Sequence, residues 1–462
     1  MYEFKGRLLP YQHEGVRWLY SRERSQDSIV GGCLFDEMGL GKTVQMLCLM
    51  ALNRVPMTLL VVPKSLLIQW EIEAKRFFPD LNVIQASNKI DEDSLRVCNL
   101  VVTTYGKIAS NKFVFTQYSW DRIIYDEAHI LKNSKSKRHI SAEEIRGKIK
   151  WFLTGTPVPN FIKDFISITK LLGVPKYMVM CKRDDVISKY VLRRTRSDVS
   201  ENCERLELPP CKIENIDVEL CDEELQCYEL IFERCKEKIS KWKSSGFIKN
   251  HIMEILEMLL RCRQALICTE LVDDCFCSKS SKIEWIEKKI IEIQKVNEKS
   301  LIFCHFRKEM NIIHDTLEKR GVRCVQINGS KSTEERNQHI EDFTTSNCNV
   351  MIIQIEAGGV GLNLQSASHV FITSPSWNPS SELQAVGRCY RTGQTKEVNV
   401  YRLCASGECQ YPLMDHSILE LQERKLNCFA ELMRDPRILK SLPQQTNSDR
   451  PSLSEICKLF MT

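Results

Sequence analysis

The sequence has no hydrophobic run long enough to cross a membrane, because its most apolar stretch, residues 58–67, is interrupted by Pro63 and Lys64. Its first ten residues lack the apolar core of a secretory signal peptide. Internal repeats and low-complexity blocks are also missing. With 43% hydrophobic and 27% charged residues, the composition excludes a disordered chain, a collagen-like repeat and a small disulfide scaffold. We therefore expect a globular chain with no membrane partner.

A strong excess of charge of one sign is missing too, since 65 Lys and Arg stand against 60 Asp and Glu, a net charge of +5. So weak a balance is compatible with nucleic acid but does not predict it. Cysteine is abundant instead, with 21 residues, an odd number that cannot pair completely. Because most cysteines stand singly in apolar stretches, we expect reduced thiols that serve as small hydrophobic residues in a reducing compartment.

The densest cysteine group is Cys262, Cys268, Cys275 and Cys277. Five, six and one residues separate its members, whereas zinc sites use pairs of cysteines two to four residues apart. We therefore expect no zinc site here.

Short apolar runs of strand length alternate with polar or helical stretches along the chain. A first series comprises residues 58–62, 100–104, 122–125 and 151–154, and a second comprises 301–304, 324–327, 350–353, 370–373 and 398–403. Such alternation predicts parallel sheets covered by helices on both faces. Between the two series, residues 219–267 show a long, charged helical pattern.

These patterns predict an α/β chain with two lobes and a helical insertion at the start of the second lobe. We place the first lobe at residues 1–205 and the linker with the helical insertion at 206–280. The second lobe then covers 281–440, and a flexible tail rich in Ser, Gln, Pro and Asn covers 441–462.

The most informative motif is Asp-Glu-Met-Gly-Leu-Gly-Lys-Thr at residues 36–43, which we call the phosphate loop. A loop of this kind needs glycines that let backbone N–H groups close around a phosphate, a lysine for the β and γ oxygens, and a hydroxyl for Mg²⁺. The strict form of the motif has Gly where this chain has Asp36. The residues expected to hold a nucleotide are Asp36, Glu37, Met38, Gly39, Leu40, Gly41, Lys42 and Thr43.

An acidic pair, Asp126 and Glu127, follows the apolar run at 122–125. We expect Asp126 to hold Mg²⁺ together with Thr43, and Glu127 to orient the attacking water. One carboxylate at the end of a strand is common on protein surfaces, but two in sequence are much rarer. The pair and the phosphate loop together predict the hydrolysis of a nucleoside triphosphate.

The run Asp-Glu-Ala-His-Ile-Leu-Lys-Asn at residues 126–133, with the phosphate loop, resembles the Swi/Snf-type branch of superfamily-two helicase-like ATPases. The part typical of this branch is Leu131-Lys132-Asn133. Further matches follow in the order of the family from about residue 8 to residue 425, at 9–12, 63–70, 153–157, 192–195, 357–364 and 384–394. The resemblance implies two RecA-like lobes that bind ATP and Mg²⁺.

The resemblance also implies roles for single residues. Gln12 would read the adenine ring, and Gly361 would belong to the nucleotide site. Arg388 and Arg391 would act as arginine fingers, which stabilise charge on the γ-phosphate and raise the rate about a thousandfold or more. The residues expected to touch the nucleic-acid backbone are Lys64, Thr104, Asn363 and Gln384.

The chain departs from the family pattern at several positions. Pro159 replaces a Gln, Ser374 replaces the acidic residue before Trp-Asn-Pro, and Glu356 stands where a basic residue often precedes Ala-Gly-Gly. The segment between Leu172 and Leu192 is short, so we expect a reduced protrusion on the first lobe.

The family resemblance implies an ATP-dependent translocase on double-stranded DNA. The alternatives are a strand-separating DNA or RNA helicase, against which Leu131-Lys132-Asn133 argues, and a nucleic-acid-binding scaffold whose ATPase has decayed. Further expected partners are chromatin, transcription or repair proteins, and the expected location is the nucleus. The bare core also resembles compact forms carried by large DNA viruses, for which a host nucleus or a viral factory is expected.

Overall fold

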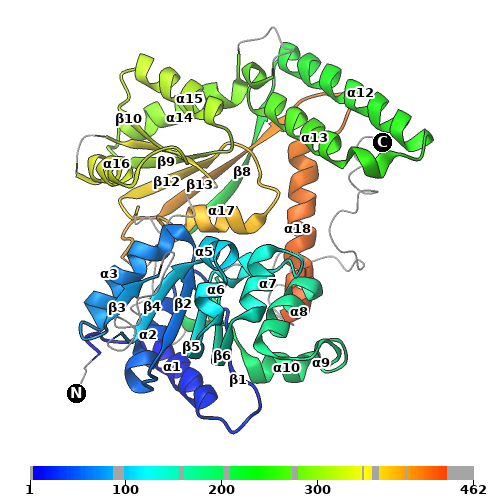
Figure 1. Ribbon diagram of the computed structural model, residues 1–462. Helices are drawn as coiled ribbons and strands as arrows, with labels where there is room; N and C mark the ends of the chain where they lie inside the picture. Colours follow the sequence, from blue (N-terminus) through cyan, green and yellow to red (C-terminus); the bar gives the residue numbers. More distant parts are fainter. Residues whose placement is uncertain are drawn as a thin grey trace. The chain divides into compact units, whose positions relative to one another are not determined.

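The computed structural model describes residues 4–86, 98–155, 161–200, 209–272, 279–345, 348–355, 364–391 and 393–433. The chain divides into two compact units (Figure 1). Residues 1–207 form the bulk of unit one, and residues 208–427 form the bulk of unit two. The lobe boundaries expected from the sequence stay predictions.

Unit one is built on a parallel sheet whose seven described strands run in the order β3-β4-β2-β5-β6-β1-β7. Its strands are β1 (Val30–Leu34), β2 (Thr58–Val62), β3 (Val83–Gln85), β4 (Leu100–Thr104), β5 (Ser119–Asp126), β6 (Arg146–Leu153) and β7 (Val191–Leu192).

Helices of unit one connect these strands and cover both faces of the sheet (Figure 1). They are α1 (Pro10–Glu23), α2 (Lys42–Leu52), α3 (Leu67–Phe77), α5 (Tyr105–Ser110), α6 (Phe113–Thr116), α7 (Lys137–Glu144), α8 (Phe161–Leu172), α9 (Lys176–Cys181), α10 (Arg183–Tyr190) and α11 (Arg196–Ser200), with single 3₁₀ turns η1 (Lys64–Leu66) and η2 (Ala128–Leu131).

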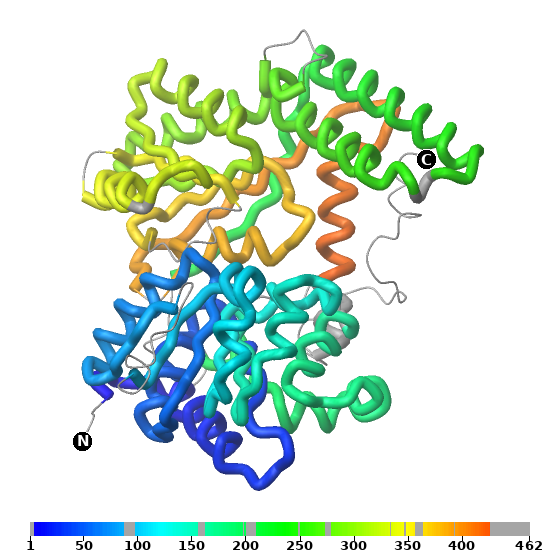
Figure 2. The backbone as a smooth tube through the Cα atoms, viewed as in Figure 1, coloured from blue at the N-terminus to red at the C-terminus, as the bar shows by residue number. Residues whose placement is uncertain are grey.

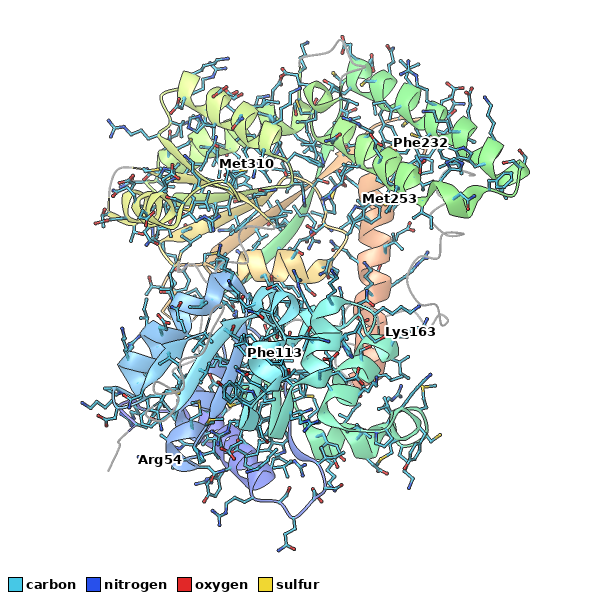
Figure 3. The ribbon with its side chains drawn as sticks, in the orientation of Figure 1. Arg54, Phe113, Lys163, Phe232, Met253 and Met310 are labelled. Carbon is cyan, nitrogen blue, oxygen red and sulfur yellow. The ribbon has the colours of Figure 1, made fainter. Side chains whose placement is uncertain are left out.

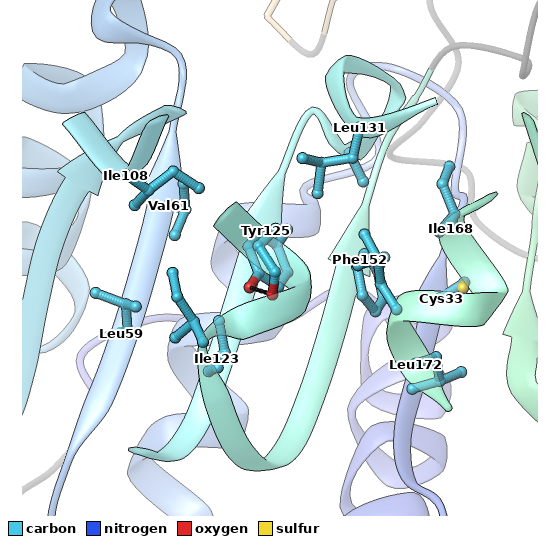
Figure 4. Packing of buried hydrophobic residues seen from close by; sticks show 14 of the residues in the cluster. Cys33, Leu59, Val61, Ile108, Ile123, Tyr125, Leu131, Phe152, Ile168 and Leu172 are labelled. Carbon is cyan, nitrogen blue, oxygen red and sulfur yellow. Dashed lines mark hydrogen bonds between the residues drawn. The ribbon is translucent and has the colours of Figure 1, made fainter. Parts of the chain in front are cut away.

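The strands of this sheet bury side chains on both faces, which is why they read as continuous apolar runs. In β2, Leu59 and Val61 join one cluster of buried residues, and Leu60 and Val62 join another on the opposite face. Figure 4 shows the first cluster, in which the ring of Tyr125 stacks on another aromatic ring at a centroid distance of 5.1 Å.

Unit two contains a second parallel sheet, with six described strands in the order β10-β11-β9-β12-β13-β8. Its strands are β8 (Cys211–Glu219), β9 (Lys299–Cys304), β10 (Cys324–Ile327), β11 (Val350–Gln354), β12 (Ala367–Ile372) and β13 (Val398–Ser406). Its helices are α12 (Asp222–Ser244), α13 (Ile252–Ile267), α14 (Ser281–Gln294), α15 (Arg307–Lys319), α16 (Thr333–Thr345), α17 (Pro379–Val386) and α18 (Met414–Met433), with the turns η4 (Ile248–His251) and η5 (Thr269–Leu271).

The helical insertion predicted before the second series of strands is present as α12 and α13, which pack against each other and can be followed as a hairpin in Figure 2. These two helices supply most of one hydrophobic cluster, which Ala405 of β13 joins and which the start of α18 joins through Met414 and Ile418. Phe232 of α12 is buried in this cluster, whereas Met253 of α13 is 74% exposed (Figure 3).

Every apolar run expected to be a strand is one, with ends that differ by a few residues. Four strands were not predicted. In β1 two glycines, Gly31 and Gly32, dilute the apolar signal, while β3 and β7 have only three and two residues. The fourth, β8, alternates charged and apolar residues after Pro210 and lies in a segment we expected to be linker and helix; it pairs in parallel with β13.

None of the described helices combines the length and the apolarity that a membrane crossing requires. Cys227 is disulfide-bonded, whereas fifteen other cysteines are free thiols. The expectation of reduced cysteines is therefore wrong for Cys227, and its position on α12 gave no sequence signal for a disulfide.

A buried ion pair ties α1 to the middle of the sheet in unit one. The guanidinium of Arg122 on β5 donates to both carboxylate oxygens of Glu23, at 2.6 and 2.5 Å, and both side chains are at most 1% exposed. The Trp151 indole N–H and the Asn53 amide also donate to this carboxylate, at 2.8 and 2.6 Å. Its charge is thus balanced and its hydrogen-bonding capacity is used.

Replacing Glu23 by alanine would leave the Arg122 charge buried without its partner. We expect Glu23→Ala to lower the free energy of unfolding of unit one by about 3–5 kcal/mol, measured by chemical denaturation. The exposed pair between Lys148 and Asp121, on neighbouring strands, is the control, and Lys148→Ala should cost less than about 1 kcal/mol. Equal effects of the two substitutions would contradict a dominant role for the buried pair.

Candidate nucleotide-binding site

The motifs singled out in the first lobe meet at one edge of the sheet in unit one. Leu34 of β1 pairs with Leu153 of β6, and Leu153 pairs with Asp126 of β5. The phosphate loop, Thr154 and Glu127 therefore follow three neighbouring parallel strands at the same level. In open α/β sheets this edge, outside the carboxyl ends of the strands, is where ligands bind.

The phosphate loop leaves β1 and enters α2 through two glycines in left-handed backbone conformation, Gly39 with φ of 87° and Gly41 with φ of 76°. Gly41 directly precedes α2, so the free N–H groups of the first helical turn, which includes Lys42 and Thr43, face the loop. The Lys42 Nζ donates to the carbonyl oxygens of Asp36 and Glu37, at 2.8 and 3.3 Å. The backbone carbonyls of the phosphate loop thus hold the ammonium group of Lys42 over the loop.

Asp36, which replaces the glycine of the strict motif, is completely buried and forms an ion pair with Arg194. The guanidinium donates to both carboxylate oxygens, with Nε to Oδ1 at 3.0 Å. Gln45 of α2 also donates to Asp36, at 3.0 Å, and accepts from Arg194 at 2.8 Å. The Asp36 side chain therefore holds the loop in place, and only its backbone carbonyl faces Lys42.

Gln12, expected to read adenine, lies on α1 beside the end of the phosphate loop. Its amide Nε2 donates to the carbonyl of Leu40 at 3.3 Å, and Tyr11 donates to the same carbonyl at 3.1 Å. A Cβ atom at Gly41 would lie only 2.5 Å from the Gln12 amide nitrogen. Gly41 is therefore needed both for its positive φ and for this close approach.

Asp126 ends β5 and is nearly buried, at 7% exposure. The indole N–H of Trp70 donates to its Oδ2 at 2.7 Å, and the phenol of Tyr105 donates to its backbone carbonyl at 2.7 Å. Burial, and then the neighbouring charge of Glu127, raise the pKa of Asp126 to about 6, while the positive charge of Lys42 acts in the opposite direction. The Asp126 carboxylate thus lies where a positive charge is favourable.

Glu127 turns the chain sharply at the end of β5, with a left-handed φ of 51° that is unusual for a residue with a side chain. Its carboxylate lies 3.2 Å from Nδ1 of His129 and accepts from the Thr154 hydroxyl at 3.5 Å. The same His129 nitrogen lies 3.3 Å from the Thr154 hydroxyl. These contacts join the acidic motif to the motif that follows β6.

Gly155 continues the motif after β6 and packs directly against the phosphate loop. A Cβ atom at this position would lie 2.5 Å from Cγ of Met38 and 2.7 Å from Nζ of Lys42. Any larger residue would displace the lysine.

Two of the expected nucleic-acid contacts lie at the same sheet edge, on the other side of β5. Lys64 is exposed in the turn after β2, and Thr104 ends the neighbouring strand β4, where its hydroxyl caps α5 by accepting from Lys107 N at 3.3 Å. Gln384 lies half-buried on α17 in unit two. Asn363 and Gly361 lie outside the described residues.

Arg388 and Arg391 follow α17 in what we call the arginine segment, residues 387–391. Arg388 is 9% exposed, and its carbonyl accepts from Leu364 N at 3.0 Å. Gln394 closes the segment, since its amide donates to the carbonyls of Gln365, Ala367 and Cys389 at 2.9–3.3 Å.

The departure at Ser374 has a structural explanation. The Ser374 hydroxyl donates to the carboxylate of Asp415 on α18 at 2.9 Å, and Arg263 of α13 donates to Ser374 at 3.2 Å. Asp415 is completely buried and also accepts from Lys282 at 2.5 Å. Asp415 of α18 thus places a carboxylate beside Ser374.

Several sequence expectations fall outside the described residues. These are Glu356, Pro159, and the two cysteines Cys275 and Cys277 of the densest cysteine group. Within the described part of the chain, no three or more His, Cys, Asp or Glu side chains are grouped to hold a metal ion.

The sequence interpretation missed the residues that hold the site together. Arg194 and Trp70 occur inside quoted motifs, at 192–195 and 63–70, but their partners were not predicted. Gln45 and Tyr105 gave no signal at all, because each acts through a contact with a residue distant in sequence.

Models of two protein domains match the chain. The model of the SNF2-related domain matches residues 11–182, and that of the helicase conserved C-terminal domain matches residues 281–393. YwqA of Bacillus subtilis, named as an ATP-dependent helicase/translocase, is 31% identical over 443 residues, which cover 87% of this chain and 47% of the relative. The human SWI/SNF-related matrix-associated actin-dependent regulator of chromatin subfamily A member 1 is 29% identical, with 96% of this chain and 45% of the relative covered.

Among solved structures, the SWI2/SNF2 ATPase core of Sulfolobus solfataricus in complex with double-stranded DNA is 26% identical over 96% of each chain, with a TM-score of 0.42. The chain spans less than half the length of the curated relatives named above. Fold, site and domain matches together define the class, a helicase-like ATPase core with two α/β units. Within that class, the chain belongs to the Swi/Snf-type family.

Restoring the strict phosphate-loop motif tests the role of Asp36. We expect Asp36→Gly to weaken ATP binding at least tenfold, about 1.4 kcal/mol, because Arg194 and Gln45 lose the carboxylate that fixes the loop. Titration with a fluorescent ATP analogue measures the dissociation constant. Asp36→Asn, which keeps the size and one acceptor, should weaken binding less. Unchanged or tighter binding in Asp36→Gly would show that this carboxylate does not hold the loop.

Proposed function

We propose that this chain hydrolyses ATP with Mg²⁺ and uses the free energy to move along double-stranded DNA. The observation that carries the proposal is the meeting of the phosphate loop, Asp126–Glu127 and Thr154–Gly155 at one edge of the sheet in unit one. A glycine loop with its lysine at a helix N-terminus binds phosphate, and the adjacent acidic pair serves its hydrolysis.

Lys42 and the N-terminus of α2 bind the β- and γ-phosphates in this proposal. The ammonium group now donates to two loop carbonyls, and phosphate oxygens replace these acceptors when the nucleotide binds. Gln12, beside the end of the loop, is the residue proposed to contact the adenine base.

The oxygen donors of Thr43 and Asp126 fit Mg²⁺, which proteins hold through one or two carboxylates together with substrate phosphates. Burial has raised the pKa of Asp126, and such a carboxylate gains from a neighbouring cation. When bound, Mg²⁺ neutralises charge that develops on the phosphate oxygens.

Glu127 is the residue proposed to orient the attacking water. Its backbone is left-handed, and the contacts of its carboxylate with His129 and Thr154 limit the movement of the side chain. Thr154 and Gly155 thereby connect the group that handles the water with the loop that holds the phosphates.

Arg388 and Arg391 are proposed to stabilise the transferred phosphoryl group, as the family resemblance implies. Lys64, Thr104, Asn363 and Gln384 are proposed to touch DNA phosphates, which gives binding that is independent of sequence and sensitive to salt. The names of the relatives, a helicase/translocase and a regulator of chromatin, support a motor on DNA over a scaffold without ATPase activity. The nucleus stays the proposed location.

Glu127→Gln tests the assignment of the catalytic residues. The amide keeps the shape of the side chain but cannot accept the proton or orient the water as the carboxylate does, so we expect kcat for ATP hydrolysis to fall at least about a hundredfold. Binding of a fluorescent ATP analogue should remain within about threefold of the parent protein, because the phosphate loop is unchanged. Turnover at the parental rate would rule out this role for Glu127.

The nature of the nucleic acid is tested by measuring the rate of ATP hydrolysis with no nucleic acid, RNA, single-stranded DNA and double-stranded DNA. We expect the strongest stimulation by double-stranded DNA, with a response that falls as salt rises. Stimulation by RNA or by single strands alone would instead favour a strand-separating helicase. Hydrolysis under no condition would favour the scaffold.

A further inference from the structure

Glu382 on α17 is an almost completely buried carboxylate in unit two, at 2% exposure, and it has no place in the reaction proposed above. Its Oε2 accepts from Nε and Nη2 of Arg402 on β13, at 2.8 and 2.6 Å. Its Oε1 accepts from the backbone N–H of Ser376 and the amide of Gln422 on α18, both at 2.6 Å. One carboxylate thus joins a strand, a second helix and the turn before α17.

Glu382 lies close in sequence to the arginine segment, so its contacts affect that segment. It lies in the middle of α17, and the arginine segment begins directly after this eight-residue helix. Beyond the segment, Gln394 is buried and bonded to three carbonyls. The arginine segment is therefore held between two buried polar side chains, one on each side.

We propose that Glu382 is the positioning residue of the arginine segment, acting with Arg402 and Gln422 to set where Arg388 and Arg391 lie. The inference rests on the function proposed above, in which these arginines stabilise charge on the γ-phosphate. Glu382 itself touches neither nucleotide nor DNA in this proposal. It acts through α17, because the helix cannot shift without breaking the four hydrogen bonds to the carboxylate.

Only a carboxylate suits this place. Four donors converge on Glu382, and Arg402 is 19% exposed, so its charge is poorly solvated. An amide of the same size has one oxygen, and its NH₂ group would face the guanidinium instead of accepting from it. Arg402 also donates to Asn215 of β8 at 3.0 Å, so the arginine remains tied to the sheet when Glu382 is changed. The substitution therefore loosens α17 rather than the sheet.

The experiment compares Glu382→Gln with Arg391→Ala and with a matched control in the full chain. The control is Glu287→Gln, which breaks a Glu–Arg pair between Glu287 and Arg320 in the same unit, away from α17. Steady-state ATP hydrolysis in the presence of double-stranded DNA gives kcat and KM for each variant. Hydrogen exchange of the peptide that covers α17 and the arginine segment gives the local mobility.

We expect Glu382→Gln to lower kcat about tenfold or more with KM for ATP within twofold, because a misplaced catalytic group costs rate while Lys42 and Gln12 still bind the nucleotide. Exchange in α17 should be faster, and Glu287→Gln should change neither quantity. A lower kcat with an unchanged KM, together with exchange that is faster in α17 and the arginine segment but not elsewhere in unit two, is not expected from general destabilisation.

Two results would separate failure of this inference from failure of the proposed function. If Arg391→Ala lowers kcat but Glu382→Gln keeps the parental kcat, the positioning role is wrong and the arginine role stands. If Arg391→Ala and Arg388→Ala both keep the parental kcat, the finger role itself is wrong. A loss of kcat in Glu382→Gln that is matched by an equal rise in KM, or that comes with faster exchange throughout unit two, would also overturn the positioning role.

Discussion

The proposed nucleotide site of unit one depends on an ion pair that lies underneath the phosphate loop. Asp36 is completely buried, so its charge is tolerable only because Arg194 and Gln45 surround it with donors. The pair connects the loop after β1 with the chain that leaves β7, and it leaves the backbone of the loop free to face Lys42 and a phosphate. A glycine at this position would give the backbone of the loop more conformational freedom. In this chain, the ion pair of Asp36 restricts that freedom instead.

The same physical device occurs in both units. Each unit has a buried carboxylate, Asp36 in one and Glu382 in the other, that accepts hydrogen bonds from several donors. Each of these carboxylates lies near a segment that carries functional cations, Lys42 in the phosphate loop and the arginines in the arginine segment. Because an unpaired buried charge is costly, such a group tolerates few alternative positions for its neighbours. These contacts thereby fix the conformation of loops at the edge of a sheet that have little regular secondary structure. The Glu23–Arg122 pair does the same for the contact of α1 with the sheet.

Most of the fold was predictable, because strands buried on both faces leave continuous apolar runs, as in residues 58–62. Strands with weaker apolar patterns were not predicted, because β1 contains two glycines and β8 carries charged residues at the open edge of its sheet. In the site, local motifs were visible, such as the phosphate loop and the acidic pair. Arg194 was quoted, but its partnership with Asp36 spans 158 positions and leaves no periodic trace in the sequence. Contacts of this kind appear only once the chain is folded.

The substitution at Ser374 has a consequence for how such sequences can change. Ser374 and Asp415 share one buried place, where Lys282 contacts Asp415 and Arg263 contacts Ser374. An aspartate at 374 would bring two carboxylates together away from water, and the loss of Asp415 would remove the negative charge that faces Lys282. A change at either position therefore alters the net charge of this buried place unless a neighbouring residue changes with it.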